Sequence, residues 1–140
     1  MIGAHLPAAD DQPHPFPFCV RSVRPAGFRP QSRGEKLEEL DVKSAALEHR
    51  HWWYAARRAL VRRTVRSWPA GRAIDVGCGM GGNTAVLREL GWQAVGVEYT
   101  ATGAGIAASR GIPVLRGDGR QLPVADGSVD LVMSTDAWEH

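Results

Sequence analysis

The fold is decided by residues 73–84, which run Ala73-Ile74-Asp75-Val76-Gly77-Cys78-Gly79-Met80-Gly81-Gly82-Asn83-Thr84. The apolar run 73–76 predicts a buried strand, the glycines predict a tight turn, and residues 84–90 predict a helix. Glycine suits this turn because it adopts positive φ and lets a ligand approach the backbone. The free N–H groups at the start of the following helix favour an anionic or strongly polar group. The unit therefore predicts a site for a nucleotide-type ligand.

The glycine spacing leaves two ligand classes open. The first two glycines fit the G-x-G-x-x-G pattern of dinucleotide-binding proteins when taken with Gly82, and a G-x-G-x-G pattern when taken with Gly81. Both patterns expect an acid such as Glu98 after the next apolar run, where it can accept hydrogen bonds from ribose hydroxyls. Asp75 separates the two classes, because a carboxylate just before the turn repels a pyrophosphate and attracts an amino group. A cationic ligand is therefore favoured.

Further motifs follow the glycine turn in a fixed order. They are Val95-Gly96-Val97-Glu98, Gly117-Asp118, Leu122-Pro123-Val124-Ala125-Asp126-Gly127-Ser128-Val129-Asp130-Leu131-Val132 and Asp136-Ala137-Trp138-Glu139-His140. Together with the glycine turn, this series resembles the motifs of class I S-adenosylmethionine-dependent methyltransferases over roughly residues 48–140. The resemblance implies a Rossmann-like, doubly wound α/β domain that binds S-adenosylmethionine at the carboxyl ends of its parallel strands.

The resemblance also implies a set of cofactor-binding residues. We expect S-adenosylmethionine to be held by Asp75, Gly77, Gly79, Gly81, Glu98, Tyr99, Asp118, Gly119 and Asp136. The family pattern assigns Asp118 to the adenine amino group with the Gly119 backbone alongside, although an Asp between two glycines also suits an ordinary turn. Tyr99 would lie against the adenine or support the loop.

Two residues near the end of the sequence have alternative roles. Asp136 would bind the methionine amino group or the acceptor, or would cap the next helix. His140 is the candidate catalytic base, because the pKa of histidine suits proton transfer near neutral pH.

The periodicity predicts parallel strands at 73–76, 94–97, 114–116 and 129–133, with helices at 84–90 and 101–110. The resemblance implies the strand order 3-2-1-4, which is part of a seven-stranded sheet of order 3-2-1-4-5-7-6. We therefore expect an incomplete sheet from a truncated or fragmentary gene product. The fourth strand would be a bare apolar edge, which favours self-association.

The residues before the predicted domain at 71–140 form two segments. Residues 1–34 contain most of the prolines and few aliphatic residues, so we expect a disordered tail. Residues 35–70 favour helix and predict an N-terminal helical cap. One apolar stripe of this cap is expected to pack on the sheet, and its members are Trp53, Ala56, Leu60, Val61, Thr64 and Trp68.

The cap has two features with alternative explanations. Its arginines 57, 58, 62, 63 and 66 either contact a nucleic acid or membrane, or form a solvated helix face. The segment 48–57 resembles a signature that precedes the glycine motif in a subset of the family. By that analogy Trp52 and Trp53 lie beside the sulfonium, where cation–π attraction is available, and Arg57 lies near the cofactor carboxylate. The alternative is that both tryptophans are core aromatics.

Composition sets the remaining limits. The chain has 140 residues, 44% of them hydrophobic, and a net charge of +2, which predicts one modest domain and no nucleic-acid partner. The two cysteines lack the spacing of a disulfide framework or a metal site. No apolar run approaches the ~18 residues of a membrane helix, and the start does not fit a signal peptide. We expect a cytoplasmic protein without a membrane partner.

The function expected from these features is S-adenosylmethionine-dependent methyl transfer. A small-molecule acceptor rests on family analogy alone. A non-catalytic remnant or interaction module stays open as an alternative. A dinucleotide-binding dehydrogenase domain is disfavoured by Asp75 and by the motifs at 117–118 and 122–123.

Overall fold

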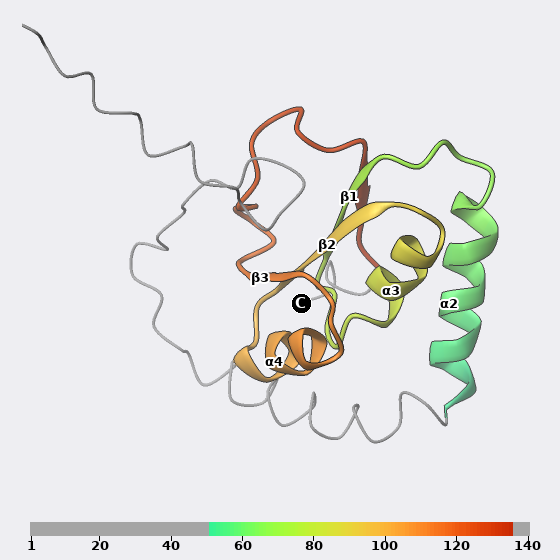
Figure 1. The fold of residues 1–140 in the computed structure, drawn as a ribbon. Helices are drawn as coiled ribbons and strands as arrows, with labels where there is room; N and C mark the ends of the chain where they lie inside the picture. The colour runs from blue at the N-terminus through green and yellow to red at the C-terminus, as the bar shows by residue number, and fades with distance from the viewer. Residues whose placement is uncertain (1–50, 136–140) are drawn as a thin grey trace, which may run out of the picture.

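The computed structural model describes residues 51–135, which form a layered α/β unit (Figure 1). Its elements in chain order are α2 Trp52–Val65, β1 Arg72–Val76, α3 Gly82–Glu89, β2 Gln93–Glu98, α4 Ala101–Ser109, β3 Val114–Arg116 and β4 Leu131–Met133. The predicted tail at 1–34, the first part of the predicted cap, and the candidate residues Asp136 and His140 lie outside the described residues.

The four strands pair in parallel in the order β3-β2-β1-β4. Because parallel neighbours need crossover connections, α3 links β1 to β2 and α4 links β2 to β3. In the central strand, Asp75 has Gly96 as its neighbour on β2 and Met133 as its neighbour on β4. The predicted Rossmann-like class and the strand order 3-2-1-4 are confirmed.

Two apolar clusters cover the two faces of the sheet, because successive strand side chains alternate between faces. On one face Ala73 and Ala94 pack with Leu87 of α3. On the other face Ile74 and Val97 pack with apolar residues of the connection between β3 and β4. This connection therefore covers a sheet face without being a helix.

The prediction that the apolar stripe of α2 packs on the sheet is wrong. Val61 and Val65 are buried, and they join Leu87 in the cluster on that face, so α2 packs mainly on α3. Leu60 is 64% exposed and Trp53 is 42% exposed. A helix that packs on another helix buries only a narrow apolar stripe. The six stripe positions at helical spacing predict a wider buried face, of the kind that packs on a sheet.

The last strand is shorter than predicted. It begins at Leu131, because Val129 instead packs in the second cluster and Asp130 bonds to β1. The Asp130 carboxylate accepts a hydrogen bond from the Arg72 N–H at 2.8 Å, and the Asp130 N–H donates to the Arg72 carbonyl. Within residues 51–135, β4 is an edge strand, and Val132 on it is 55% exposed.

Replacing Gly96 with alanine should destabilise the fold by about 1–3 kcal/mol, the usual effect of overpacking a core. An added Cβ would lie 2.4 Å from the Sγ and 2.9 Å from the Cβ of Cys78. The matched control is Gly105→Ala in α4, where an added Cβ meets nothing within 4 Å and alanine favours helix. Urea unfolding of both variants measures the difference, and equal stabilities would contradict the packing explanation.

Candidate functional site

The glycine turn between β1 and α3 has alternating left-handed residues. Gly77, Gly79 and Gly81 have φ values of 72°, 53° and 83°. Gly82 is the first residue of α3, and Gly81 is its N-cap. The three glycines that need positive φ are therefore those of the G-x-G-x-G pattern, and the conformation does not require a glycine at position 82.

The turn leaves space on one side and is closely packed on the other. An added Cβ at Gly79 would meet nothing within 4 Å, whereas one at Gly81 would lie 2.9 Å from the Ile112 side chain. Gly81 is therefore required for packing as well as for its φ. The open backbone at Gly79 is where a ligand can approach the turn.

Glu98, at the end of β2, connects directly to this turn. Its Oε2 accepts a hydrogen bond from the Gly79 N–H at 2.8 Å, and its Oε1 accepts from the Thr100 N–H and hydroxyl at 2.8 and 3.0 Å. A carboxylate has about four acceptor positions, so Oε2 keeps capacity for one more donor. The predicted ribose acceptor therefore lies at the turn and is already partly engaged by the chain.

Asp75 lies deeper than expected. It is 1% exposed, and its Oδ2 accepts a hydrogen bond from the Thr84 hydroxyl at 2.7 Å. Burial raises the pKa of Asp75 to about 7, and the hydrogen bond from Thr84 opposes part of this shift. Asp75 therefore supports the turn from within the sheet, and the carboxylate that the sequence predicted to attract an amino group is held by α3.

Asp118 follows β3 and is engaged by a partner that the sequence did not indicate. Its carboxylate accepts hydrogen bonds from the Arg120 N–H and Nε–H, both at 2.9 Å to Oδ1. These hydrogen bonds hold the pKa of Asp118 below its usual range. Gly119 lies between the pair and is exposed, and an added Cβ there would be 3.0 Å from Val76.

Backbone hydrogen bonds align the strand ends that carry these residues. The Gly77 N–H donates to the Val97 carbonyl at 2.8 Å, and the Gly117 N–H donates to the Glu98 carbonyl at 3.0 Å. Tyr99, half-buried, follows Glu98, and its carbonyl accepts from Arg116. The structure therefore brings Gly77, Gly79, Glu98 and the 117–119 turn to one edge of the sheet. Their binding of the cofactor stays a prediction.

Three hydroxyl and amide side chains near this edge were missed by the sequence analysis. Thr84 binds Asp75, Thr100 binds Glu98, and Asn83 donates to the Thr135 hydroxyl at 3.1 Å beyond β4. Thr100 also caps α4 by accepting from the Gly103 N–H. A Thr just before a predicted helix is a recognised N-cap signal, so Thr100 was detectable. The other two depend on the packing of α3 against the sheet.

Arg57 approaches the same region from α2. Its guanidinium lies 3.6 Å from the centre of the Trp53 ring, and its charge opposes part of the rise in the pKa of Asp75 that burial causes. The Trp53 ring also meets Tyr54 edge-on. Trp53 is therefore a platform for Arg57 and not a core aromatic, whereas Trp52 is 72% exposed.

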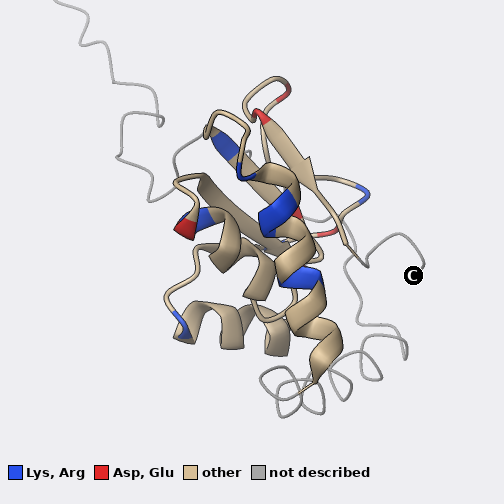
Figure 2. Ribbon diagram, turned by 90° about the vertical axis from the view of Figure 1, so that its right-hand side faces the viewer, with Lys and Arg blue, Asp and Glu red and all other residues tan. Residues whose placement is uncertain are grey.

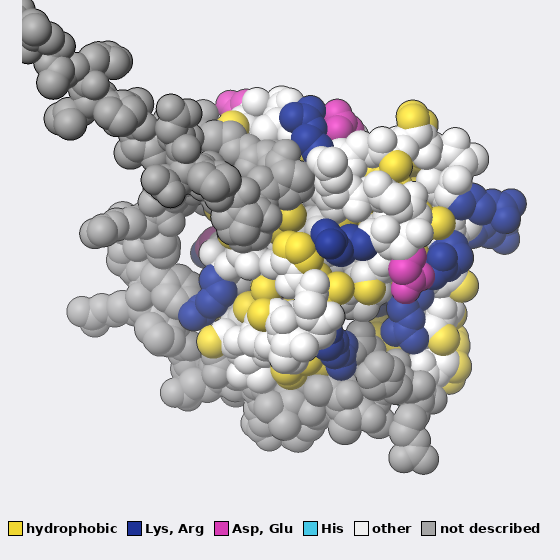
Figure 3. Space-filling view, viewed as in Figure 1, with side chains coloured by type: hydrophobic (Ala, Val, Ile, Leu, Met, Phe, Trp, Pro, Cys, Tyr) yellow, Lys and Arg dark blue, Asp and Glu magenta, His cyan; other side chains and the backbone are white. Residues whose placement is uncertain are grey.

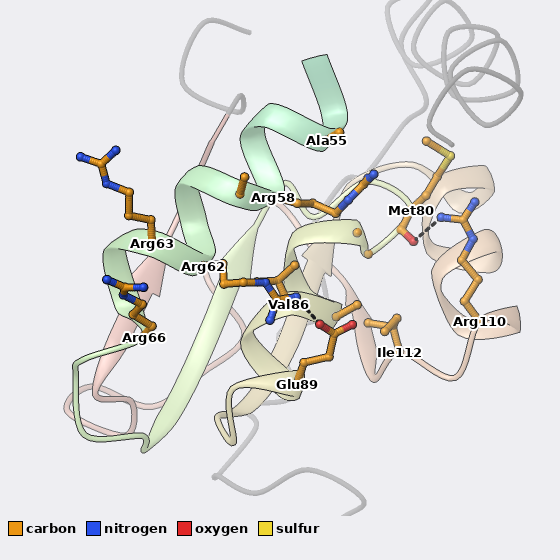
Figure 4. A pocket seen from close by; sticks show the side chains of 14 residues that line it. Ala55, Arg58, Arg62, Arg63, Arg66, Met80, Val86, Glu89, Arg110 and Ile112 are labelled. Atoms are coloured by element: carbon orange, nitrogen blue, oxygen red, sulfur yellow. Dashed lines mark hydrogen bonds and ion pairs between the residues drawn. The ribbon is translucent and has the colours of Figure 1, made fainter. Parts of the chain in front are cut away.

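A groove of about 740 Å³ lies beside the turn, between α2, α3 and the end of α4 (Figure 4). Arg58 and Arg62 extend into it from α2, and Arg110 faces them and donates to the Met80 carbonyl. Of the predicted cofactor residues only Gly81 lines this groove. The strand-end site is preferred for the cofactor, because Gly79 and Glu98 lie there and not in the groove.

Three further observations concern metal ligands, thiols and membrane helices. Among residues 51–135, no cluster of three or more histidine, cysteine, aspartate or glutamate side chains is arranged to hold a metal. Cys78 is a buried free cysteine, and burial raises the pKa of its thiol. None of the helices within this range is long and apolar enough to span a membrane.

Comparison with known proteins identifies the motif series. Residues 74–140 match the family model described as a methyltransferase domain. The chain is 43% identical over 84 residues to an uncharacterized methyltransferase of Mycobacterium sp. strain JLS. This alignment covers 58% of this chain and 33% of that protein. Residues 74–140 are therefore similar to a methyltransferase domain.

Solved structures described as methyltransferases share this fold. A protein from Methanococcus maripaludis, assigned as an S-adenosyl-L-methionine-dependent methyltransferase, superposes with a TM-score of 0.64 at 14% identity, covering 71% of this chain and 50% of that one. A SAM-dependent methyltransferase of Thermotoga maritima, described as a possible histamine N-methyltransferase, gives a TM-score of 0.58 at 25% identity, covering 72% and 46%. The dehydrogenase alternative is not favoured by these comparisons.

The residues present fit S-adenosylmethionine. The open side of Gly79 admits a ligand to the backbone, and Glu98 offers an acceptor beside it. The chain matches about a third of the mycobacterial relative's length, 33%.

Replacing Asp75 with asparagine should stabilise the fold at neutral and alkaline pH. The pKa of Asp75 is about 7 in the folded chain against an ordinary value of 3.8 for an exposed aspartate, so between these values the folded state binds the extra proton. The unfolding free energy of the wild type should therefore fall as pH rises from about 4 to about 7 and then level off. The asparagine amide can still accept from Thr84, but it lacks this titration.

Urea unfolding of both proteins across this pH range tests the assignment. The stability difference between Asp75→Asn and the wild type should grow with pH up to about 7. Parallel curves for the two proteins would show that the carboxyl is ionised in the folded chain throughout.

Proposed function

We propose that this chain binds S-adenosylmethionine at the carboxyl ends of β1, β2 and β3 and serves methyl transfer to a small-molecule acceptor. The observation that carries the proposal is the 2.8 Å hydrogen bond from the Gly79 N–H to Glu98, beside a backbone that is open at Gly79. An acceptor carboxylate therefore lies beside a glycine turn whose backbone a ligand can approach. This arrangement suits a ligand whose ribose hydroxyls donate to the carboxylate.

The proposed binding residues are those implied by the family motifs. Gly77, Gly79 and Gly81 would shape the turn, and Glu98 would accept from the ribose. Asp118 and Gly119 would meet the adenine, which requires the Asp118 carboxylate to share its acceptor positions with Arg120. Tyr99 would flank the adenine. Asp136, also proposed to bind the cofactor, lies outside the described residues.

Asp75 would act on the cofactor indirectly. Its carboxyl is buried and bonded to Thr84, so it would orient the turn and place negative charge near the ligand's amino group. A cationic group nearby favours the ionised form of a carboxyl, so cofactor binding and ionisation of Asp75 should support each other.

The cofactor supplies an activated methyl group when bound, and the protein contributes orientation and proximity. We propose that residues 71–140 provide this cofactor domain and residues 35–70 a helical cap. A small-molecule acceptor is supported by the Thermotoga maritima structure, which is described as a possible histamine N-methyltransferase. His140, the proposed base, lies outside the described residues.

Glu98→Ala should weaken binding of S-adenosylhomocysteine, the demethylated cofactor, by about 1.5–3 kcal/mol, the range for hydrogen bonds to charged groups. Isothermal titration of the full chain measures this, with circular dichroism of the same samples to establish that each is folded. Glu89→Ala is the matched control, because Glu89 is exposed and pairs with Arg62 on the other side of α3.

Two outcomes would contradict the proposal. Unchanged affinity in folded Glu98→Ala would exclude the ribose assignment. Binding of NAD in preference to S-adenosylhomocysteine by the wild-type chain would exclude the methyltransferase function.

A further inference from the structure

The exposed apolar surface of the described residues is concentrated on one helix. Trp52 is 72% exposed, Leu60 64% and Trp53 42%, and Trp68, just after α2, is 48% exposed. We call these four side chains the outer ridge of α2. Among residues 51–135, Val132 on β4 is the only other large apolar side chain with comparable exposure. A ridge with three tryptophans is unusual for a surface helix.

Arginines accompany this ridge along the helix. Arg62, Arg63 and Arg66 are exposed, and Figure 2 shows basic positions along α2. Arg62 pairs with Glu89 of α3. Arg63 and Arg66 line the same groove, but their side chains point away from that pair (Figure 4). The helix itself contains no acidic residue.

The arginines of α2 have no acidic side chain on their own helix, so an anion that neutralises them must come from another part of the protein or from a partner. Arg62 and Arg66 are four residues apart, and like charges at this spacing destabilise a helix. Arg62 and Arg63 do lie in the last turn, where the helix dipole favours a positive charge. The dipole accounts for charge at that end, but it does not account for the apolar ridge beside it.

The shape and chemistry of the surface favour a lipid bilayer over other anionic partners. α2 lies at the outside of the molecule, at the edge of the view in Figures 1 and 3, and α3 lies between it and the sheet. A nucleic acid would use the arginines but offers no apolar environment for Leu60. A bilayer interface offers both, because tryptophan and leucine enter the acyl boundary while arginines reach headgroup phosphates.

We propose that α2 docks this protein on an anionic membrane surface, with the outer ridge in the headgroup–acyl boundary and Arg63 and Arg66 at the phosphates. The helix would lie in the plane of the interface. The docking surface shares only Trp53, the platform for Arg57, with the region of the strand-end site, and docking does not depend on the proposed methyl transfer.

The test is sedimentation of the full chain with lipid vesicles. One vesicle contains equal parts of phosphatidylglycerol and phosphatidylcholine, and the other contains phosphatidylcholine alone. The chain should bind the anionic vesicle and not the neutral one, and added salt should weaken the binding. Arg63→Glu should reduce partitioning about tenfold or more, since each arginine near an anionic surface contributes roughly fivefold.

Matched variants distinguish binding through α2 from effects of net charge and from nonspecific hydrophobic binding. Arg116→Glu makes the same change in net charge on β3, at the far edge of the sheet, and should leave binding unchanged. Leu60→Ser should weaken binding, whereas Val132→Ser should not, although both remove an exposed aliphatic side chain. Circular dichroism establishes that each variant is folded, and Arg66→Glu provides a second reversal on α2.

Several results would overturn the proposal. They are no sedimentation of the folded chain with anionic vesicles, equal binding to both vesicles, and equal losses in the α2 variants and their controls. Binding of poly(U) without binding of vesicles would assign the arginines to a nucleic acid instead.

Discussion

The hydrogen bonds to the carboxylate of Glu98 are the constraint on which the ligand-facing edge of the sheet depends. They join the glycine turn at Gly79 to the end of β2 and, through Thr100, to the start of α4. A turn built from glycines has little conformational restraint of its own, so it needs an anchor from a neighbouring strand. Parallel pairing of β1 with β2 provides that neighbour, and the sheet order therefore positions the site.

Asp75 shows how the same region combines stability with binding. Its burial disfavours the charged form, and Thr84 supplies one strong hydrogen bond in compensation. A residue selected for stability alone at this position would be apolar, like its neighbours Ile74 and Val76. The buried carboxyl therefore lowers the folding stability, and a positively charged ligand group nearby would offset this loss by favouring its ionised form.

The helical layer divides into an inner and an outer part. Val61 and Val65 attach α2 to α3, which leaves the tryptophans and most arginines of α2 outside the core. Arg57 differs, because it stacks on Trp53 and influences Asp75. One helix thus places the charge of Arg57 near Asp75 and exposes tryptophans and arginines on its outer face.

The sequence by itself determined the strand–turn–helix unit, the parallel order of the strands and the edge at which Gly79 and Glu98 meet. The strand–turn–helix unit follows from glycine spacing and short apolar runs, which are local in the chain. The strand order and the common edge follow from the family resemblance that the order of the motifs carries. Only the tertiary structure decided which face of α2 is buried, and that Thr84 holds Asp75 and Arg120 engages Asp118. The burial of a helix face and the partner of a carboxylate depend on what packs against them, and periodicity within one segment does not contain that information.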